Sequence, residues 1–306
     1  MIYLNSAKEN WVVDRFRKEW YLHNKSISTK LSNNAKILWI ISPWTWHKIN
    51  KNKFNSKKVV CTIHHIDLNK FDSDAEKEFK ERDKYVDIYH AISEKTYSQI
   101  KDLTQKPIKV IPFWVNQNIW FEIKNKEELR EKLNIDKSDF LIGNFQRDTE
   151  GFDLKSPKLS KGPDQFLKIV LELDKDKKNI HILLAGKRRN YLINELIKNN
   201  IKYTYFEMTS FDKLNELYNC LDLYIVASRV EGGPQALFEC AITKTPIVST
   251  DVGFARNILS AESIFDINNF NAAKPNTLEA YEKVQQYIIP KGFHEYKKLF
   301  EELIES

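Results

Sequence analysis

The chain has 306 residues, of which 42% are hydrophobic and 29% charged, and this globular composition excludes a disordered or fibrous protein. The length exceeds the usual ~100–150 residues of a single domain, so we expect two domains with a cleft between them. A formal net charge of +6 favours anionic partners such as nucleoside diphosphates, an anionic membrane or nucleic acid, with a solvated lysine surface as the alternative.

The cysteines and the longest apolar runs indicate the compartment. Cys61, Cys220 and Cys240 are far apart and lie in apolar runs, which argues against a disulfide framework and against a zinc site. No apolar run approaches the ~20 residues of a membrane-spanning helix. The N-terminus also lacks the basic and long apolar regions of a signal peptide. We therefore expect a soluble, cytoplasmic protein, and its lysines leave peripheral contact with a membrane open.

Short β-branched and aromatic runs, each followed by an amphipathic stretch, predict an α/β protein with parallel sheets. In the first part, the expected strands lie at residues 2–5, 37–42, 59–64, 88–92 and 109–112, with helices beginning near residues 10, 73 and 93. In the second part, strands are expected at 140–145, 180–185, 202–206, 223–227 and 246–250, with helices beginning near 163, 191, 211 and 235.

A change of pattern marks the boundary between the two parts. Pro112 and a polar cluster interrupt the alternation, so we place the boundary near residue 120 and expect domains at 1–120 and 121–288. The last segment, 289–306, has helical periodicity. All seven tryptophans precede the boundary, and core packing is the usual role of this residue. Trp44 and Trp46, just past a strand, are the better candidates for stacking on sugar rings.

Residues 227–241, Ala-Ser-Arg-Val-Glu-Gly-Gly-Pro-Gln-Ala-Leu-Phe-Glu-Cys-Ala, have the features of a ligand-binding turn. A buried strand runs into Gly232 and Gly233, which let the backbone approach a ligand closely. Pro234 suits the first position of the helix that follows. The N–H groups at the start of this helix should attract negative or polar oxygen atoms.

Two carboxylates flank this turn. Glu231 precedes the helix and Glu239 lies in its early turns, so both can face one ligand at points several ångströms apart. A sugar nucleotide offers hydroxyl groups in two places, on the hexose and on the ribose, with a diphosphate between them. The spacing of the two carboxylates suits such a molecule.

Glu231 and Glu239 also resemble the Glu-x7-Glu motif of retaining glycosyltransferases with the GT-B fold, especially family 4, the group 1 glycosyl transferases. Similar residues surround the motif: Ser228, Ala241, 246–248, 251–253, and in the same domain Arg147 after a strand and the pair Lys161-Gly162. The resemblance implies two Rossmann-like parallel-sheet domains facing a central cleft. Residues 1–120 would lie on the acceptor side, residues 121–288 would bind the nucleotide sugar, and the helix at 289–306 would return to the first domain.

The resemblance further implies roles for individual residues. Arg147 and Lys161 would bind the donor diphosphate, Glu231 the transferred sugar and Glu239 the ribose. His64, at the end of a strand, matches the position of a histidine beside the sugar, with a purely structural histidine as the alternative. The implied catalytic residues are His64, Arg147, Lys161 and Glu231. The implied donor-binding residues are Gly232, Gly233, Pro234, Gln235 and Glu239, and Lys187, past another strand end, joins them with surface charge as the equal alternative.

Two stretches depart from the family pattern. The segment 148–160, between Arg147 and Lys161, is longer than expected. The glycine-containing loop after the first strand is missing, because residues 6–10 contain no glycine. Lys8 and Asn10 are candidates to contact phosphate or acceptor in its place.

The expected function is transfer of a hexose-type sugar from a nucleoside diphosphate sugar, UDP- or GDP-linked, to the hydroxyl of an unidentified acceptor, with retention of the anomeric configuration. No cofactor or metal is expected. Asp72-Ser-Asp74 resembles a metal motif of the other glycosyltransferase fold, but its charged surroundings predict the start of a solvated helix. The alternatives are a sugar phosphorylase or epimerase of GT-B architecture, and a non-catalytic module that binds sugar nucleotides or nucleic acid.

Overall fold

The computed structural model describes residues 1–9, 12–176 and 179–305. It divides into two compact units: unit 1 comprises Met1–Trp114 and Pro290–Ser306, and unit 2 comprises Val115–Ile289. Unit 1 ends earlier than the expected boundary near residue 120. The backbone of Val115 hydrogen-bonds to Tyr287 and Ile289, and Trp120 is fully buried against Tyr218, so this stretch belongs to unit 2.

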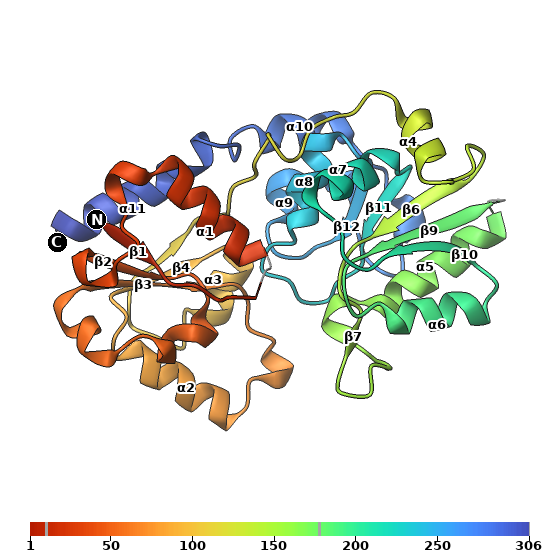
Figure 1. Ribbon diagram of the computed structural model, residues 1–306. Helices are drawn as coiled ribbons and strands as arrows, with labels where there is room; N and C mark the ends of the chain where they lie inside the picture. The colour runs from red at the N-terminus through yellow and green to blue at the C-terminus, as the bar shows by residue number, and fades with distance from the viewer. Residues whose placement is uncertain (10–11, 177–178, 306) are drawn as a thin grey trace. The chain divides into compact units, whose positions relative to one another are not determined.

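Unit 1 is a parallel sheet with helices on both faces (Figure 1). Within the described residues its strands are adjacent in chain order: β1 (Ile2–Leu4), β2 (Ile37–Ile40), β3 (Lys58–Ile63), β4 (Ile88–Ala91) and β5 (Ile108–Val110). Its helices are α1 (Val12–His23), α2 (Ser73–Asp83), α3 (Glu94–Ile100) and α11 (His294–Glu305). The strands predicted from the sequence are confirmed. The predicted helix start near residue 10, Asn10 itself and Trp11 lie outside the described residues.

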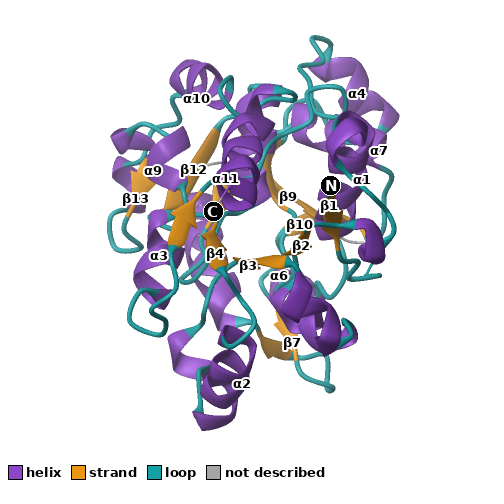
Figure 2. Cartoon of the chain, turned by 90° about the vertical axis from the view of Figure 1, so that its left-hand side faces the viewer, coloured by secondary structure: helices purple, strands orange, loops and turns teal. Residues whose placement is uncertain are grey.

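The two faces of this sheet are packed differently. In β2, Leu38 and Ile40 face a hydrophobic cluster that includes Phe79 of α2 and Ile100 of α3. The intervening Trp39 faces the opposite side, as expected from the two-residue period of a strand. That side is covered by α1 and α11, whereas α2 lies on the side of the hydrophobic cluster, in both views of the chain (Figures 1 and 2).

The face covered by α11 carries a cluster of aromatic side chains. Trp20 of α1 makes ring contacts with Trp39, Trp114, Tyr296 and Phe300, at centroid separations of 5.3, 6.1, 6.3 and 5.5 Å. All these side chains are buried. Burial of these aromatic side chains stabilises the packing of α11 against the rest of unit 1. The two candidates for stacking on sugar rings differ in exposure, because Trp46 is buried in the hydrophobic cluster with Phe79 while Trp44 is exposed.

A buried hydrogen-bond chain lies under the same aromatic face. Trp39 Nε1 donates to Thr62 Oγ1 (2.8 Å), and Thr62 lies 2.9 Å from His90 Nδ1. His90 Nε2 lies 2.6 Å from the carbonyl oxygen of Ile111. Because a carbonyl can only accept, Nε2 carries the proton and Nδ1 accepts from Thr62. Burial, with a smaller effect from His64, lowers the pKa of His90 to about 3, so the ring is neutral in the folded protein.

We expect His90 to make the protein less stable in acid. Its pKa is lower in the folded protein than the usual ~6.5 of an unfolded chain, so its contribution is complete above pH ~6.5 and is lost as the pH falls toward 3. Between pH 7.5 and 4.5 the loss should be on the order of 2–3 kcal/mol. Urea unfolding of wild type and His90→Gln should show a smaller loss in the variant, whereas substitution of the exposed His47 should leave the pH dependence unchanged. Equal pH dependence in wild type and His90→Gln would contradict this expectation.

Unit 2 is a second parallel sheet with a small hairpin attached. Within the part of the chain that the structure describes, the sheet order is β10-β9-β6-β11-β12-β13, and the hairpin is formed by β7 and β8. The strands are β6 (Phe140–Asn144), β7 (Thr149–Glu150), β8 (Ser156–Pro157), β9 (Ile180–Ala185), β10 (Lys202–Phe206), β11 (Leu223–Val226), β12 (Ile247–Thr250) and β13 (Ile264–Phe265). The helices are α4 (Lys126–Lys132), α5 (Pro163–Asp176), α6 (Asn190–Lys198), α7 (Phe211–Cys220), α8 (Gln235–Thr243), α9 (Ala255–Ile258) and α10 (Thr277–Val284).

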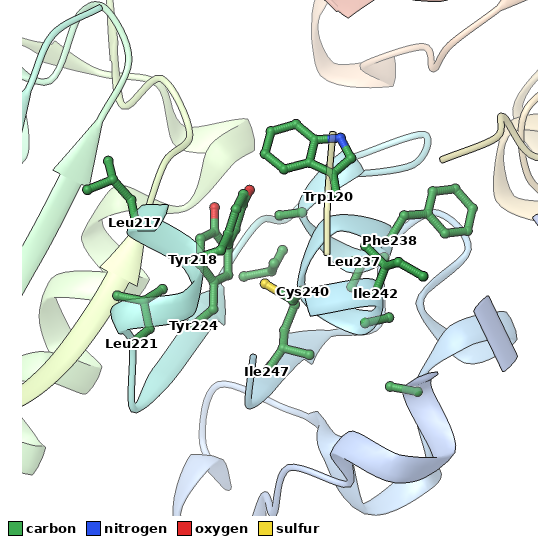
Figure 3. Close-up of a cluster of buried hydrophobic side chains, with 14 of the residues drawn as sticks. Trp120, Leu217, Tyr218, Leu221, Tyr224, Leu237, Phe238, Cys240, Ile242 and Ile247 are labelled. Carbon is green, nitrogen blue, oxygen red and sulfur yellow. The ribbon is translucent and has the colours of Figure 1, made fainter. Parts of the chain in front are cut away.

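The strands of unit 2 bury both faces, which explains their nearly continuous apolar sequences. In β11, Tyr224 and Val226 belong to a cluster with helices α4, α7, α8 and α10, while Leu223 and Ile225 belong to a cluster with α5 and α6. Figure 1 shows these two groups of helices on opposite sides of the sheet. Figure 3 shows the first cluster, where side chains of α7 and α8 meet those of β11. The sequence did not predict β13 or the β7–β8 hairpin.

Candidate functional site

The order of the strands in unit 2 identifies where a ligand should bind. From β6 the chain first adds β9 and β10 on one side, and then returns to add β11, β12 and β13 on the other. The strand order therefore reverses between β6 and β11, which pair in parallel. In open α/β sheets the loops diverge at such a point, and ligands bind outside the carboxyl ends of the strands. Residues 145–148 follow β6 and residues 227–234 follow β11.

Glu231 is the centre of a polar cluster at this point. Its Oε1 atom lies 2.5 Å from Lys161 Nζ, 3.4 Å from Gln146 Nε2 and 3.4 Å from Ser228 Oγ. The Glu231 and Lys161 side chains are 9% and 18% exposed, so their ion pair is largely shielded from water. Side chains of two other loops and of its own loop thus contact this carboxylate. Arg147, Lys161 and Glu231 were predicted to share a site, and the structure brings all three to this edge of the sheet.

Backbone hydrogen bonds hold the Lys161 loop against the Glu231 loop. The N–H groups of Arg229 and Val230 donate to the carbonyl of Ser160, at 2.9 and 3.0 Å. Arg229 also binds both carboxylate oxygens of Asp164, at 2.7 and 2.6 Å. These contacts explain how residues about seventy positions apart in sequence reach a fixed mutual geometry.

Glu239 lies on α8 and is buried, at 6% exposure. Its Oε2 atom accepts a hydrogen bond from the hydroxyl of Tyr218 (2.8 Å), a residue of α7. Burial, and then the neighbouring Glu239, raise the pKa of Tyr218 well above its ordinary value, so the hydroxyl remains a donor. Tyr218 was missed in the sequence because nothing local distinguishes it from the other buried aromatic residues.

The glycines of the turn are required mainly by close packing. A Cβ at Gly233 would lie 1.9 Å from the ring of Phe254. Gly253 has φ +53°, and a Cβ there would lie 2.4 Å from the carbonyl oxygen of Gly232. Pro234 is the N-cap residue of α8 rather than its first helical residue, which is Gln235. The prediction that Pro234 occupies the first helical position was therefore wrong by one residue.

The basic residues after β9 have separate environments. Lys187 is exposed, which is compatible with both of its predicted roles, binding of the donor and a solvated surface charge. Arg189 is buried, and its Nε atom lies 2.8 Å from Asp148 Oδ2 while its Nη2 atom donates to Asn144 Oδ1 (2.8 Å). Arg189 thus stabilises the loop after β6, which carries Arg147. The sequence did not predict this supporting role of Asp148 and Arg189.

Arg147 is half-buried and donates from Nε to the carbonyl of Thr149 (2.9 Å). Burial, and then the neighbouring Arg188, lower its pKa from the usual value, and Glu150 opposes this effect. An arginine stays protonated at neutral pH even so. Its guanidinium group therefore brings a second positive charge to the edge of the sheet where Lys161 lies.

His64 belongs to unit 1 and directly follows β3. Its Nε2 atom lies 2.9 Å from the carbonyl of Ile41, so Nε2 carries the proton and Nδ1 is an acceptor. The ring stacks on Phe113 at 5.8 Å and lies 5.7 Å from the ring of Trp44. Burial lowers the pKa of His64 to about 4, which makes the ring neutral at pH 7. This imidazole can accept a hydrogen bond from a hydroxyl group.

The loop after β1 has no glycine but is ordered by a carboxylate. Asp14 accepts hydrogen bonds from the backbone N–H groups of Lys8 (3.4 Å) and Glu9 (2.8 Å). Lys8 itself has a left-handed backbone with φ +59°. The Asp72-Ser-Asp74 motif lies at the start of a helix, as predicted, because Asp72 caps α2 by accepting from the N–H groups of Asp74 and Ala75.

Neither a metal-binding cluster nor a membrane-spanning helix occurs among the described residues. No three of the His, Cys, Asp and Glu side chains in these residues lie close enough together to hold a metal ion. None of the described helices combines the length and the apolar character needed to cross a membrane.

The fold, two α/β units with parallel sheets, is GT-B, and solved structures of this fold resemble the chain along its length. Sucrose-phosphate synthase from Thermosynechococcus elongatus is 14% identical with a TM-score of 0.69, over 96% of this chain and 77% of that one. HepE from Anabaena, in complex with UDP and glucose, is 10% identical with a TM-score of 0.72, over 98% and 99%. A glycosyltransferase from Rickettsia africae is 15% identical with a TM-score of 0.66, over 99% and 84%.

Residues 125–289 match the model of the family described as glycosyl transferases group 1. The chain belongs to this family and is therefore a glycosyltransferase. The match covers most of unit 2, including the polar cluster around Glu231. A search of curated protein sequences found no significant match.

Proposed function

We propose that the chain transfers a hexose-type sugar from a nucleoside diphosphate sugar to an acceptor hydroxyl, without a metal ion and with retention of the anomeric configuration. The observation that carries the proposal is the Lys161–Glu231 ion pair at the point where the strand order reverses, next to Arg147 and the start of α8. This arrangement places cations and backbone N–H groups beside a carboxylate. A sugar nucleotide has the complementary sequence of groups, an anionic diphosphate next to a hydroxyl-bearing sugar.

Each part of the site has a role in this proposal. Glu231 accepts hydrogen bonds from the transferred sugar, and Lys161 and Arg147 bind the diphosphate. Because the leaving diphosphate gains negative charge as the bond to the sugar breaks, fixed cations stabilise the transition state more than the ground state. Glu231 is also oriented by Ser228 and Gln146, so it keeps its position when Lys161 binds the diphosphate instead of Glu231.

The remaining residues bind the rest of the donor. Glu239, held by Tyr218, accepts from the ribose hydroxyls. The turn at Gly232, Gly233, Pro234 and Gln235 presents backbone to the diphosphate at the start of α8. His64 accepts from a sugar hydroxyl through Nδ1, and the exposed Lys187 adds positive charge for the nucleotide. In retaining enzymes without a protein nucleophile, the acceptor attacks from the face that the diphosphate leaves, and a phosphate oxygen takes the acceptor proton.

UDP is the nucleotide that the solved structures favour, with GDP as the alternative. HepE has been solved with UDP and glucose and with UDP-glucose. These structures share the fold of this chain at 10% and 12% identity, so they support the choice of UDP as the first ligand to test.

A thermal-shift screen with UDP, GDP, ADP and TDP tests the donor site. A ligand that binds only the folded state raises the melting temperature, so one nucleotide should raise that of the wild type. Glu239→Ala should weaken that nucleotide about 10- to 100-fold, because a hydrogen bond to a charged acceptor contributes on the order of 1.5–3 kcal/mol. Its main effect should be on binding and not on turnover, since the ribose is held equally in the ground and transition states.

Two variants serve as controls for this screen. Glu127→Ala removes a carboxylate that is 76% exposed on α4 and should leave the shift unchanged. Tyr218→Phe retains Glu239 but removes its hydroxyl donor, so it should weaken binding less than Glu239→Ala. A Glu239→Ala protein with normal nucleotide affinity and reduced turnover would contradict the ribose assignment. Product analysis of the sugar released then distinguishes transfer from phosphorolysis or epimerisation.

A further inference from the structure

The segment between Arg147 and Lys161 forms a hairpin that ends beside the proposed donor site. Strands β7 and β8 pair antiparallel, with Thr149 opposite Pro157 and Glu150 opposite Ser156. The next residue, Lys158, donates its backbone N–H to the carbonyl of Asp148 (2.7 Å). The returning strand therefore brings Lys158 next to the residue that follows Arg147.

Lys158 also begins the turn that carries Lys161. The 3-10 helix at Leu159–Lys161 has Lys158 as its N-cap, and the N–H of Lys161 donates to the carbonyl of Lys158 (2.8 Å). The backbone of Lys158 is therefore fixed on one side by the hairpin and on the other side by the turn that carries Lys161.

The charges in this region are unbalanced. Burial, and then Lys161 and Arg147, lower the pKa of Lys158, while Glu150 and Glu231 raise it. These charged groups lie in the hairpin, in the turn after it, in the loop after β6 and in the loop after β11. Among the described residues, no carboxylate lies within ion-pair distance of Lys158 or of Arg147, and Lys161 is paired with Glu231. A half-buried lysine held beside two other cations raises the free energy of the empty site and lowers that of a site holding an anion.

We propose that Lys158 is a third cation of the diphosphate subsite and contacts the donor diphosphate together with Arg147 and Lys161. This inference rests on the proposed function. The hairpin positions Lys158 beside the site. This role accounts for the stretch between Arg147 and Lys161, which is longer than the motif requires. Because the diphosphate is charged before and after sugar transfer, loss of Lys158 should weaken the binding of donor and product in addition to its effect on turnover.

Calorimetric titration with UDP, GDP, inorganic pyrophosphate and uridine tests the proposal. Lys158→Ala should weaken the diphosphate that binds the wild type, and pyrophosphate, about 10-fold or more, the range of a lost charge-assisted hydrogen bond. Lys158→Arg should recover most of that affinity. Uridine, which has no phosphate, should bind wild type and variant alike. Lys155→Ala, on the exposed part of the same hairpin, should change affinity less than about twofold, as expected for a solvated charge.

The melting temperature of the ligand-free protein distinguishes phosphate binding from a structural role. Removing Lys158 relieves repulsion among three cations, so Lys158→Ala should melt at the wild-type temperature or above. A lower melting temperature, together with weaker uridine binding, would show that Lys158 supports the fold and would overturn the inference. Unchanged diphosphate affinity in Lys158→Ala would overturn it while leaving the proposed function intact. A wild type that binds none of UDP, GDP or pyrophosphate would overturn both.

Discussion

Lys161→Ala is expected to lower the turnover number about 100- to 1,000-fold, the usual effect of removing one group that stabilises developing negative charge. The Nζ atom of Lys161 lies 2.5 Å from Glu231 in a partly shielded site, so its charge acts through little intervening water. In the proposed mechanism the variant loses the cation that faces the leaving diphosphate, and Glu231 loses its cationic partner. Turnover can be measured as release of the nucleoside diphosphate from the donor that the binding screen identifies.

Lys168→Ala is the matched control for this prediction. Lys168 lies on α5, a few residues beyond Lys161, and is exposed, so its removal should leave turnover unchanged. Circular dichroism of both variants would establish that each is folded. Wild-type turnover in a folded Lys161→Ala protein would exclude Lys161 from the chemistry.

Gly162→Ala should destabilise the protein by more than about 3 kcal/mol, which places it among strongly destabilising substitutions. Gly162 has φ +62°, a left-handed conformation that costs a residue with a Cβ about 1–2 kcal/mol. The new Cβ would also lie 1.8 Å from the carbonyl oxygen of Ala227 at the end of β11. Backbone atoms must then move, and the movement displaces Lys161 and Ser228, so nucleotide affinity should fall with stability.

Gly186→Ala separates these two causes. Gly186 also has a positive φ, +90°, but a Cβ at this residue would lie 3.5 Å from its nearest neighbour, the carbonyl oxygen of Phe145. This variant should therefore show only the conformational cost, on the order of 1–2 kcal/mol in urea unfolding. Equal losses for the two variants would show that close packing against Ala227 is not what requires glycine at position 162.

Much of the architecture could be predicted from local sequence. The strands are apolar runs bounded by polar residues, and a parallel strand buried on both faces must have such a sequence whatever its neighbours are. The turn at Gly232 and Gly233 before α8 was recognisable because its residue types and spacing are set within a few positions. Glu231, Lys161 and Arg147 could be proposed as site residues for the same reason, since each has its own local pattern.

Other features depend on contacts between distant segments. Tyr218 orients Glu239 only because α7 packs against α8, and the aromatic face of unit 1 is complete only when α11 covers it. Lys187 and Arg189 look alike in sequence, yet one is exposed and the other is buried against Asp148. Their difference arises from where the loops after β6 and β9 meet.

The sequence by itself determined the class of the fold, the order of most of its strands and the residue types of the turn before α8, because hydrophobic period, glycine and charge act over a few residues. Only the tertiary structure decided which side chains support that chemistry. It formed the hairpin that places Lys158, the chain of hydrogen bonds at His90 and the shielded Lys161–Glu231 pair. Burial and ion pairing depend on distances between residues far apart in the chain, and no local pattern specifies those distances.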